Sequence, residues 1–149
     1  MSKAKSADLI LKLYDLRREE VMRKARDWMF SFNPKSAEEF EATMMDPEVG
    51  AYLRMVTSYW DMAAALVRHK AIDADMFNDT VGEHILVFAK IEPFLDELRT
   101  KWEMPDAFKH LEKVIMDRKD GAKRLKKTQE WLRSLQEGAV QEQSSEAAA

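Results

Sequence analysis

The sequence contains no cysteine and little glycine or proline, and each shortage excludes a class of structure. Without a thiol the chain has no disulfide, no thiolate nucleophile and no thiolate metal ligand. Four glycines and four prolines in 149 residues supply few of the tight turns that sheet proteins need. These shortages favour long helices joined by short loops, and they favour a reducing, cytoplasmic location.

Long apolar runs are missing as well. Charged residues interrupt the longest apolar stretches every few residues, and the N-terminal residues lead into an amphipathic segment. We therefore expect neither a signal peptide nor a membrane span. A length of 149 residues with 46% hydrophobic and 34% charged residues fits one folded domain with a sizeable core.

The net charge of -3 is distributed unevenly along the chain. Residues 1–35 carry a net charge of +4, residues 36–106 carry -9, and residues 107–149 carry +2. An acidic middle is thus flanked by basic ends. Such asymmetry guides assembly between copies or attracts a charged partner, although salt screens surface charges that are more than about 10 Å apart.

Apolar spacing and capping residues predict five helices, at about residues 6–32, 36–45, 47–69, 73–102 and 106–136. Ser6 is the expected N-cap of the first helix, and Ser36 with Glu39 forms a capping box at the second. Asp73 is the expected cap of the fourth helix, and Pro93 predicts a kink near residues 89–93. The middle of this fourth helix is apolar nearly all round, which predicts a central position in the bundle.

The predicted fold is therefore all-α, a bundle of four to five helices with a long C-terminal helix. The domain spans residues 1–136, and the Gln-, Ser-, Glu- and Ala-rich residues 137–149 form a disordered tail. Gly121 weakens the last helix by about 1 kcal/mol relative to alanine. That helix either extends the bundle or pairs with another copy of the chain.

The segment from Tyr59 to Arg99 carries a set of recurring features. They are an aromatic and acidic start, a small-residue helix, an Ile-Asp turn, an aromatic residue followed by Asp-x-x-Gly, and a proline-interrupted helix ending in arginine. In this chain they are Tyr59 and Asp61, Ala63 to Ala65, Ile72-Asp73, Phe77 with Asp79 and Gly82, Pro93, and Arg99. The segment resembles an uncharacterised family of small bacterial all-helical proteins. The resemblance implies a helical bundle and a bacterial source, and it supplies no activity.

The strongest charge feature is a basic segment in the last predicted helix, where residues 107–133 carry a net charge of +5. A basic helix with an aromatic anchor can neutralise phosphates or lie on an anionic membrane. The alternative is a solvated outer face, and the sequence pI of about 5.7 argues against nucleic acid as the partner. The candidate interaction residues are Lys119, Lys123, Arg124, Lys126, Lys127 and Trp131.

Catalytic and metal-binding candidates lie mainly between the third and fourth predicted helices. An acid–base site there would use Asp61, Asp79, Glu83 and His84, and a metal site would use Asp75, Asp79, Glu83 and His84. Asp106 and His110 share another helix face. A solvated acidic helix face is the favoured interpretation of these residues, and no di-metal Glu-x-x-His element, nucleophile elbow or phosphate loop is present. We expect no enzyme activity, no metal and no cofactor.

The ten methionines and the tryptophans bear on binding. Met44-Met45 is typical of an adaptable groove, but core filling is the favoured interpretation, and Trp102 is interpreted as an anchor of the core or of an interface. The leading hypothesis is a non-catalytic helical interaction or scaffold protein that self-associates through its C-terminal helix. Two alternatives stay open: binding of nucleic acid or an anionic surface by the basic helix, and an enzyme or metal site between helices three and four.

Overall fold

The computed structural model describes residues 2–148, and all regular secondary structure within this range is helical. This part of the chain holds nine α-helices and one 3-10 helix. In chain order they are α1 (Lys3–Arg17), α2 (Glu20–Ser31), α3 (Ala37–Met44), α4 (Gly50–Arg68), α5 (Ala74–Thr80), α6 (Glu83–Ile91), η1 (Glu92–Phe94), α7 (Leu95–Lys101), α8 (Lys109–Asp117) and α9 (Gly121–Ala148). The all-α class is confirmed. The count of four to five helices is wrong, because three predicted helices are divided.

The first division falls at Arg18 and Glu19, inside the predicted helix over 6–32. The Glu19 carboxylate accepts hydrogen bonds from the backbone N–H groups of Val21 and Met22, at 3.1 and 2.9 Å. These bonds satisfy two of the amide groups that a new helix start leaves without partners, and they lower the pKa of Glu19. A glutamate is an unusual cap, so the sequence carried no recognisable signal for this break.

The predicted cap at Ser6 is also wrong. Ser2 takes that role, since its hydroxyl accepts from the backbone N–H of Lys5 at 3.3 Å. Ser6 is buried instead, and its hydroxyl oxygen accepts from the backbone N–H of Asp73 at 2.9 Å. This bond ties α1 to the start of α5.

The predicted helix over 73–102 is divided into α5, α6, η1 and α7. Its predicted cap is confirmed, since the Asp73 carboxylate accepts from the backbone N–H of Met76 at 2.9 Å. The predicted disturbance at Pro93 is also confirmed, because η1 contains this residue and replaces α-helical turns there. The break at Val81 and Gly82 was not predicted.

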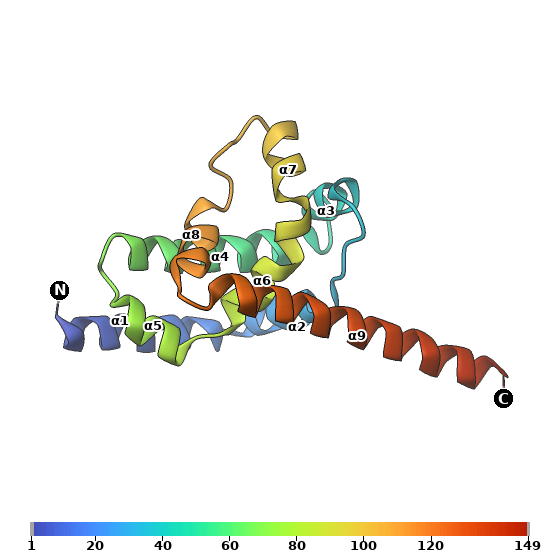
Figure 1. Ribbon diagram of the computed structural model, residues 1–149, viewed down its shortest axis with the longest axis horizontal. Helices are drawn as coiled ribbons and strands as arrows, with labels where there is room; N and C mark the ends of the chain where they lie inside the picture. Colours follow the sequence, from blue (N-terminus) through green and yellow to red (C-terminus); the bar gives the residue numbers. More distant parts are fainter. Residues whose placement is uncertain (1, 149) are drawn as a thin grey trace.

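The last predicted helix is divided at residues 118–120, into α8 and α9. Residues 137–148 continue α9 in the structure, where residues 137–149 were predicted as a disordered tail. Every residue from 137 to 148 is exposed, so this helical end has no tertiary packing. In Figure 1, α1 and the far end of α9 point to opposite ends of the long axis.

The core forms around α4 and α6. Helix α4 packs against α2 and α8, and α9 packs against α6 and α8. Seven of the nine residues of α6 are buried, which agrees with the central position predicted for this segment. Among residues 2–148, no helix combines the length and the apolar character needed to cross a bilayer.

Two charged side chains, the partly buried Glu83 and the buried Lys90, join α6 to its neighbours. Glu83 accepts from the Nε of Arg26 at 3.0 Å and from the indole N–H of Trp60 at 3.1 Å. The ammonium group of Lys90 donates to the carbonyl oxygens of Met29, Phe30 and Phe32, at 2.7, 2.8 and 2.7 Å. Lys90 thereby caps the C-terminal end of α2, where carbonyl groups lack helical partners. Burial lowers the pKa of Lys90 to about 8.

Candidate binding pocket

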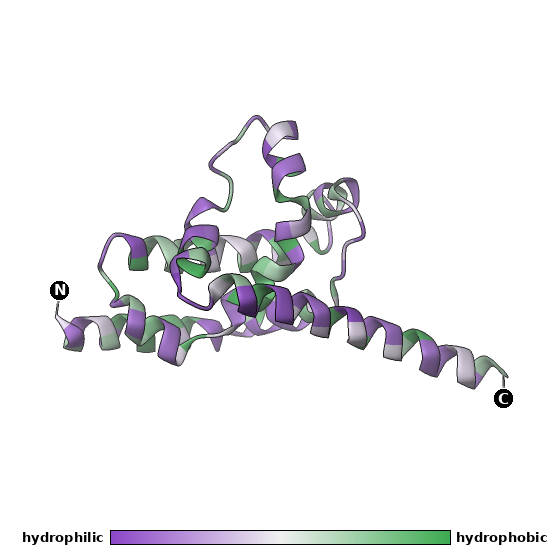
Figure 2. Cartoon of the chain, viewed as in Figure 1, coloured by the Kyte–Doolittle hydropathy of each residue, from purple (hydrophilic) through white to green (hydrophobic). Residues whose placement is uncertain are grey.

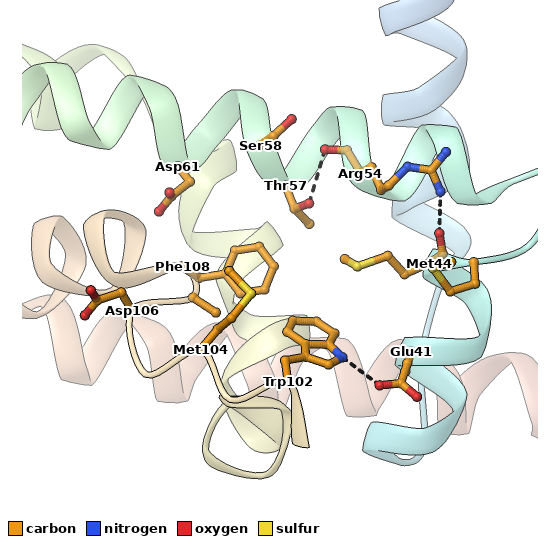
Figure 3. A pocket seen from close by; sticks show the side chains of 12 residues that line it. Glu41, Met44, Arg54, Thr57, Ser58, Asp61, Trp102, Met104, Asp106 and Phe108 are labelled. Atoms are coloured by element: carbon orange, nitrogen blue, oxygen red, sulfur yellow. Dashed lines mark hydrogen bonds between the residues drawn. The ribbon is translucent and has the colours of Figure 1, made fainter. Parts of the chain in front are cut away.

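A pocket of about 500 Å³ lies between α3, α4 and the loop of residues 102–108 (Figure 3). Its walls come from three chain segments, at residues 41–45, 54–61 and 102–108. The lining residues are Glu41, Met44, Met45, Arg54, Thr57, Ser58, Asp61, Trp102, Met104, Asp106, Ala107 and Phe108. This volume falls within the range of small-ligand sites, roughly 300–1,000 Å³.

The lining is mainly apolar and includes three methionines. Met45 is 74% exposed and Met104 is 55% exposed, whereas Met22 and Met29 are buried in the core. The favoured interpretation of the methionines as core residues is therefore wrong for Met45 and Met104. Unbranched thioether side chains adapt to differently shaped partners, so their exposure at a pocket favours binding.

Two aromatic rings meet in the pocket. The ring centroids of Trp102 and Phe108 lie 6.4 Å apart, with an interplanar angle of 61°. Phe108 has a φ of 57°, in the left-handed region that a bulky side chain rarely adopts. This conformation costs about 1–2 kcal/mol, which the surrounding contacts offset. Strained residues of this kind concentrate at functional sites.

The loop is held in place from both sides. The guanidinium Nε of Arg99 donates to the carbonyl oxygen of Ala107 at 3.0 Å, and its Nη2 contacts Glu112 Oε1 at 3.0 Å. From α4, the Asp61 carboxylate accepts from the backbone N–H of Leu111 at 3.0 Å, which caps the first turn of α8. These bonds fix the path of the chain on either side of Phe108, so the pocket is preformed.

The polar side chains of the lining are used in structural bonds. Glu41 accepts from Lys101 at 2.9 Å and from the indole N–H of Trp102 at 2.6 Å, and these two bonds lower its pKa. Arg54 donates to the carbonyl oxygen of Met44 (Figure 3). Thr57 and Ser58 donate to carbonyl groups of their own helix, at 2.8 and 3.3 Å.

The family described as "Domain of unknown function (DUF4760)" matches residues 3–118. The chain belongs to this family. No curated protein and no solved structure matches the chain. The pocket lies entirely within the segment that matches DUF4760, whereas α9 begins after it. The pocket is thus part of the DUF4760 domain, and α9 is attached to it.

The structure distributes the six candidate residues of the basic segment over several surfaces. Lys123, Arg124, Lys127 and Trp131 line one groove of about 640 Å³, together with Gly82 and Ile85 of the DUF4760 domain. Lys119 lines a different cleft, beside Arg68 and Asn78, and Lys126 lines neither. In Figure 2, hydrophilic residues alternate with less polar and hydrophobic ones along α9.

The residues of the alternative acid–base site are each engaged in a different contact. Asp61 caps α8, Glu83 binds Arg26 and Trp60, and Asp79 lines the cleft beside α8. His84 is buried against the rings of Phe77 and Trp60, at centroid distances of 5.0 and 6.0 Å. Burial lowers the pKa of His84 to about 4, with a smaller contribution from Arg118.

Of the metal candidates, Asp75 and Asp79 line the same cleft. Within residues 2–148, no group of three or more His, Asp or Glu side chains is placed to hold a metal ion. Asp106 pairs with Lys109 at 3.6 Å, and the Nδ1 of His110 lies 2.8 Å from an Arg68 nitrogen.

Most pocket residues were absent from the sequence-based candidates. Met44-Met45 was one local signal, because adjacent methionines are typical of an adaptable surface, and Trp102 was interpreted as an anchor of the core or of an interface. Asp61 and Asp106 were candidates for other sites. Met104 and Phe108 carried no signal, since only the fold brings residues 102–108 against α3 and α4.

Proposed function

We propose that this DUF4760 domain is a non-catalytic binding module whose pocket takes the apolar part of a ligand. The observation that carries the proposal is the chemistry of the lining. Met44, Met45, Met104, Trp102 and Phe108 offer apolar surface, and the loop that carries three of them is fixed by hydrogen bonds. A preformed apolar pocket is favourable for binding because little ordering accompanies ligand entry.

The same lining supports a non-catalytic role. Acid–base catalysis needs a titratable group that is free to exchange a proton with the substrate. Here the Glu41 carboxylate is bound by Lys101 and Trp102, and the Asp61 carboxylate is bound by a helix amide. Asp106 is largely solvated, with 77% of its side chain exposed. The Glu41 and Asp61 carboxylates stabilise the walls of the pocket.

The uncharged fluorescent probe N-phenyl-1-naphthylamine tests the proposal. We expect saturable binding with a Kd on the order of 10 μM, as the burial of a ligand of this size supports. The variant Ser58→Phe places a large ring at the pocket wall, so it should weaken binding about tenfold or more. Fluorescence titration of the purified full chain measures both values.

Ser134→Phe is the matched control. Ser58 and Ser134 are both exposed helical serines, and each donates to the carbonyl oxygen three residues earlier, at 3.3 and 2.7 Å. Only Ser58 lines the pocket. Equal loss of affinity in both variants, or no saturable binding by the unmodified chain, would refute the proposal.

A further inference from the structure

We propose that the pocket receives the exposed row Lys127, Trp131 and Leu135 of α9 from a second copy of this chain, with Trp131 as the inserted side chain. This inference rests on the proposed function, because it names the partner of the same pocket. It identifies a donor surface, an acceptor surface and the chemistry that matches them.

The donor surface is an exposed row on α9. Lys127, Trp131 and Leu135 follow one another at intervals of four residues, so they lie along one side of the helix. Trp131 is 48% exposed and Leu135 is 42% exposed. The neighbouring side of α9 is anchored in the core by Leu125 and Leu132. The row is therefore held at the edge of the body, where Lys127 and Trp131 also line the groove beside Gly82 and Ile85.

Trp131 is only partly covered by its own chain. It lies beside Gly82 and Ile85, and its ring meets the ring of Phe30 at a centroid distance of 6.4 Å. Tryptophan is one of the residue types that are enriched among the side chains that dominate binding at interfaces. An apolar pocket in a second copy would remove the remaining exposed ring surface from water.

The acceptor surface has the chemistry that a basic amphipathic helix requires. Exposed methionines adapt to the shape of an inserted side chain, as in other grooves that bind such helices. Glu41, Asp61 and Asp106 supply carboxylates at the wall of the pocket.

Charge complementarity selects a second copy as the partner. The lining of the acceptor pocket carries three carboxylates and the guanidinium group of Arg54, a formal charge of -2, and residues 107–133 carry +5. Lys123, Lys126 and Lys127 are exposed, and none forms an ion pair among residues 2–148. Carboxylates around the pocket would orient these lysines, and the association should weaken roughly threefold or more between low and high salt.

Two variants separate the surfaces. Ser58→Phe blocks the acceptor and leaves α9 intact, whereas Trp131→Ala removes the inserted side chain and leaves the pocket intact. We expect the unmodified chain to change from assembled to monomeric on dilution through the micromolar range. Each variant alone should be monomeric. An equal mixture of the two should form a 1:1 complex and nothing larger, because each variant keeps one half of the contact.

Analytical ultracentrifugation measures these masses, and thermal unfolding followed by circular dichroism checks that both variants fold. A monomeric unmodified chain, assembly of Trp131→Ala to the same extent as the unmodified chain, or no complex in the mixture would each overturn the inference. Probe binding by Trp131→Ala distinguishes the two proposals. Probe binding by Trp131→Ala together with a monomeric unmodified chain rejects the second copy and retains the pocket, and no probe binding by Trp131→Ala rejects both.

Discussion

His84 lies in the core with 1% of its surface exposed, and neither ring nitrogen has a hydrogen-bond partner among residues 2–148. A charged imidazolium there would lose its hydration without compensation, which is why burial lowers its pKa to about 4. In the unfolded chain the pKa is about 6.5. The unfolded state therefore binds the proton first as the pH falls. The contribution of neutral, buried His84 to the free energy of unfolding is therefore fully present above pH 6.5 and is lost as the pH falls from 6.5 to 4.

This difference in pKa predicts a loss of about 3 kcal/mol in the free energy of unfolding between pH 7 and pH 4. His84→Leu keeps a similar side-chain volume and removes the titrating group, so its pH dependence should be flatter over the same range. Urea unfolding at several pH values measures both chains. Parallel curves for the two chains would show that His84 does not control the acid sensitivity.

Gly121 shows how an element boundary is set by packing rather than by propensity. The sequence alone marks this glycine as a weak point within a long helix. In the structure it is the first residue of α9, directly after the chain turns from α8. A Cβ atom built at Gly121 would lie 1.7 Å from the carbonyl oxygen of Ile115. The glycine is required because the two helices approach each other closely at this turn.

Gly121→Ala should therefore lower the free energy of unfolding by about 2 kcal/mol or more, since the backbone must move to remove the overlap. Gly138→Ala is the matched control, because nothing lies within 4 Å of its Cβ position and the residue is exposed on the same helix. We expect the control to change stability by less than about 0.5 kcal/mol, with a small gain in helix content. Denaturant unfolding compares the two, and equal effects would contradict the steric explanation.

Helix ends were predictable where one side chain encodes them. Ser36 accepts from the Glu39 backbone N–H at 3.0 Å, and Asp73 caps α5, as their spacing predicted. The breaks at Glu19 and at residues 118–120 were not predictable. Neither contains proline, and the apolar spacing continues across both, so the division into shorter helices depends on tertiary contacts.

At the scale of the whole molecule, the sequence identified the class of fold but not the pocket. Periodicity reports which residues of one helix face inward, and this was sufficient for an all-α domain with α6 in its centre. The pocket combines segments that are up to about 60 residues apart, such as Met44 and Met104. No local pattern records that juxtaposition. The charge asymmetry was readable, and the structure places its two signs on different surfaces, at the pocket and along α9.

The stability of the far end of α9 also depends on the whole molecule, because no other helix packs against residues 137–148. Leu132 is the last buried residue of α9, and Gln136 makes its last side-chain contact with the body, a bond of 2.5 Å from Lys35. The predicted domain boundary falls after the same residue. A segment of about 12 residues without packing is marginal as a helix in water.

Hydrogen exchange of the monomeric Trp131→Ala chain should therefore divide α9 into two parts. We expect strong protection of backbone amides between Leu125 and Leu132, and exchange of residues 138–148 within about tenfold of an unstructured peptide. Deletion of residues 137–149 should then shift the melting temperature by less than about 1 °C, because no buried contact is lost. Protection that continued to residue 146 in this monomer would contradict the expectation, since it would require packing of the helix end on its own body.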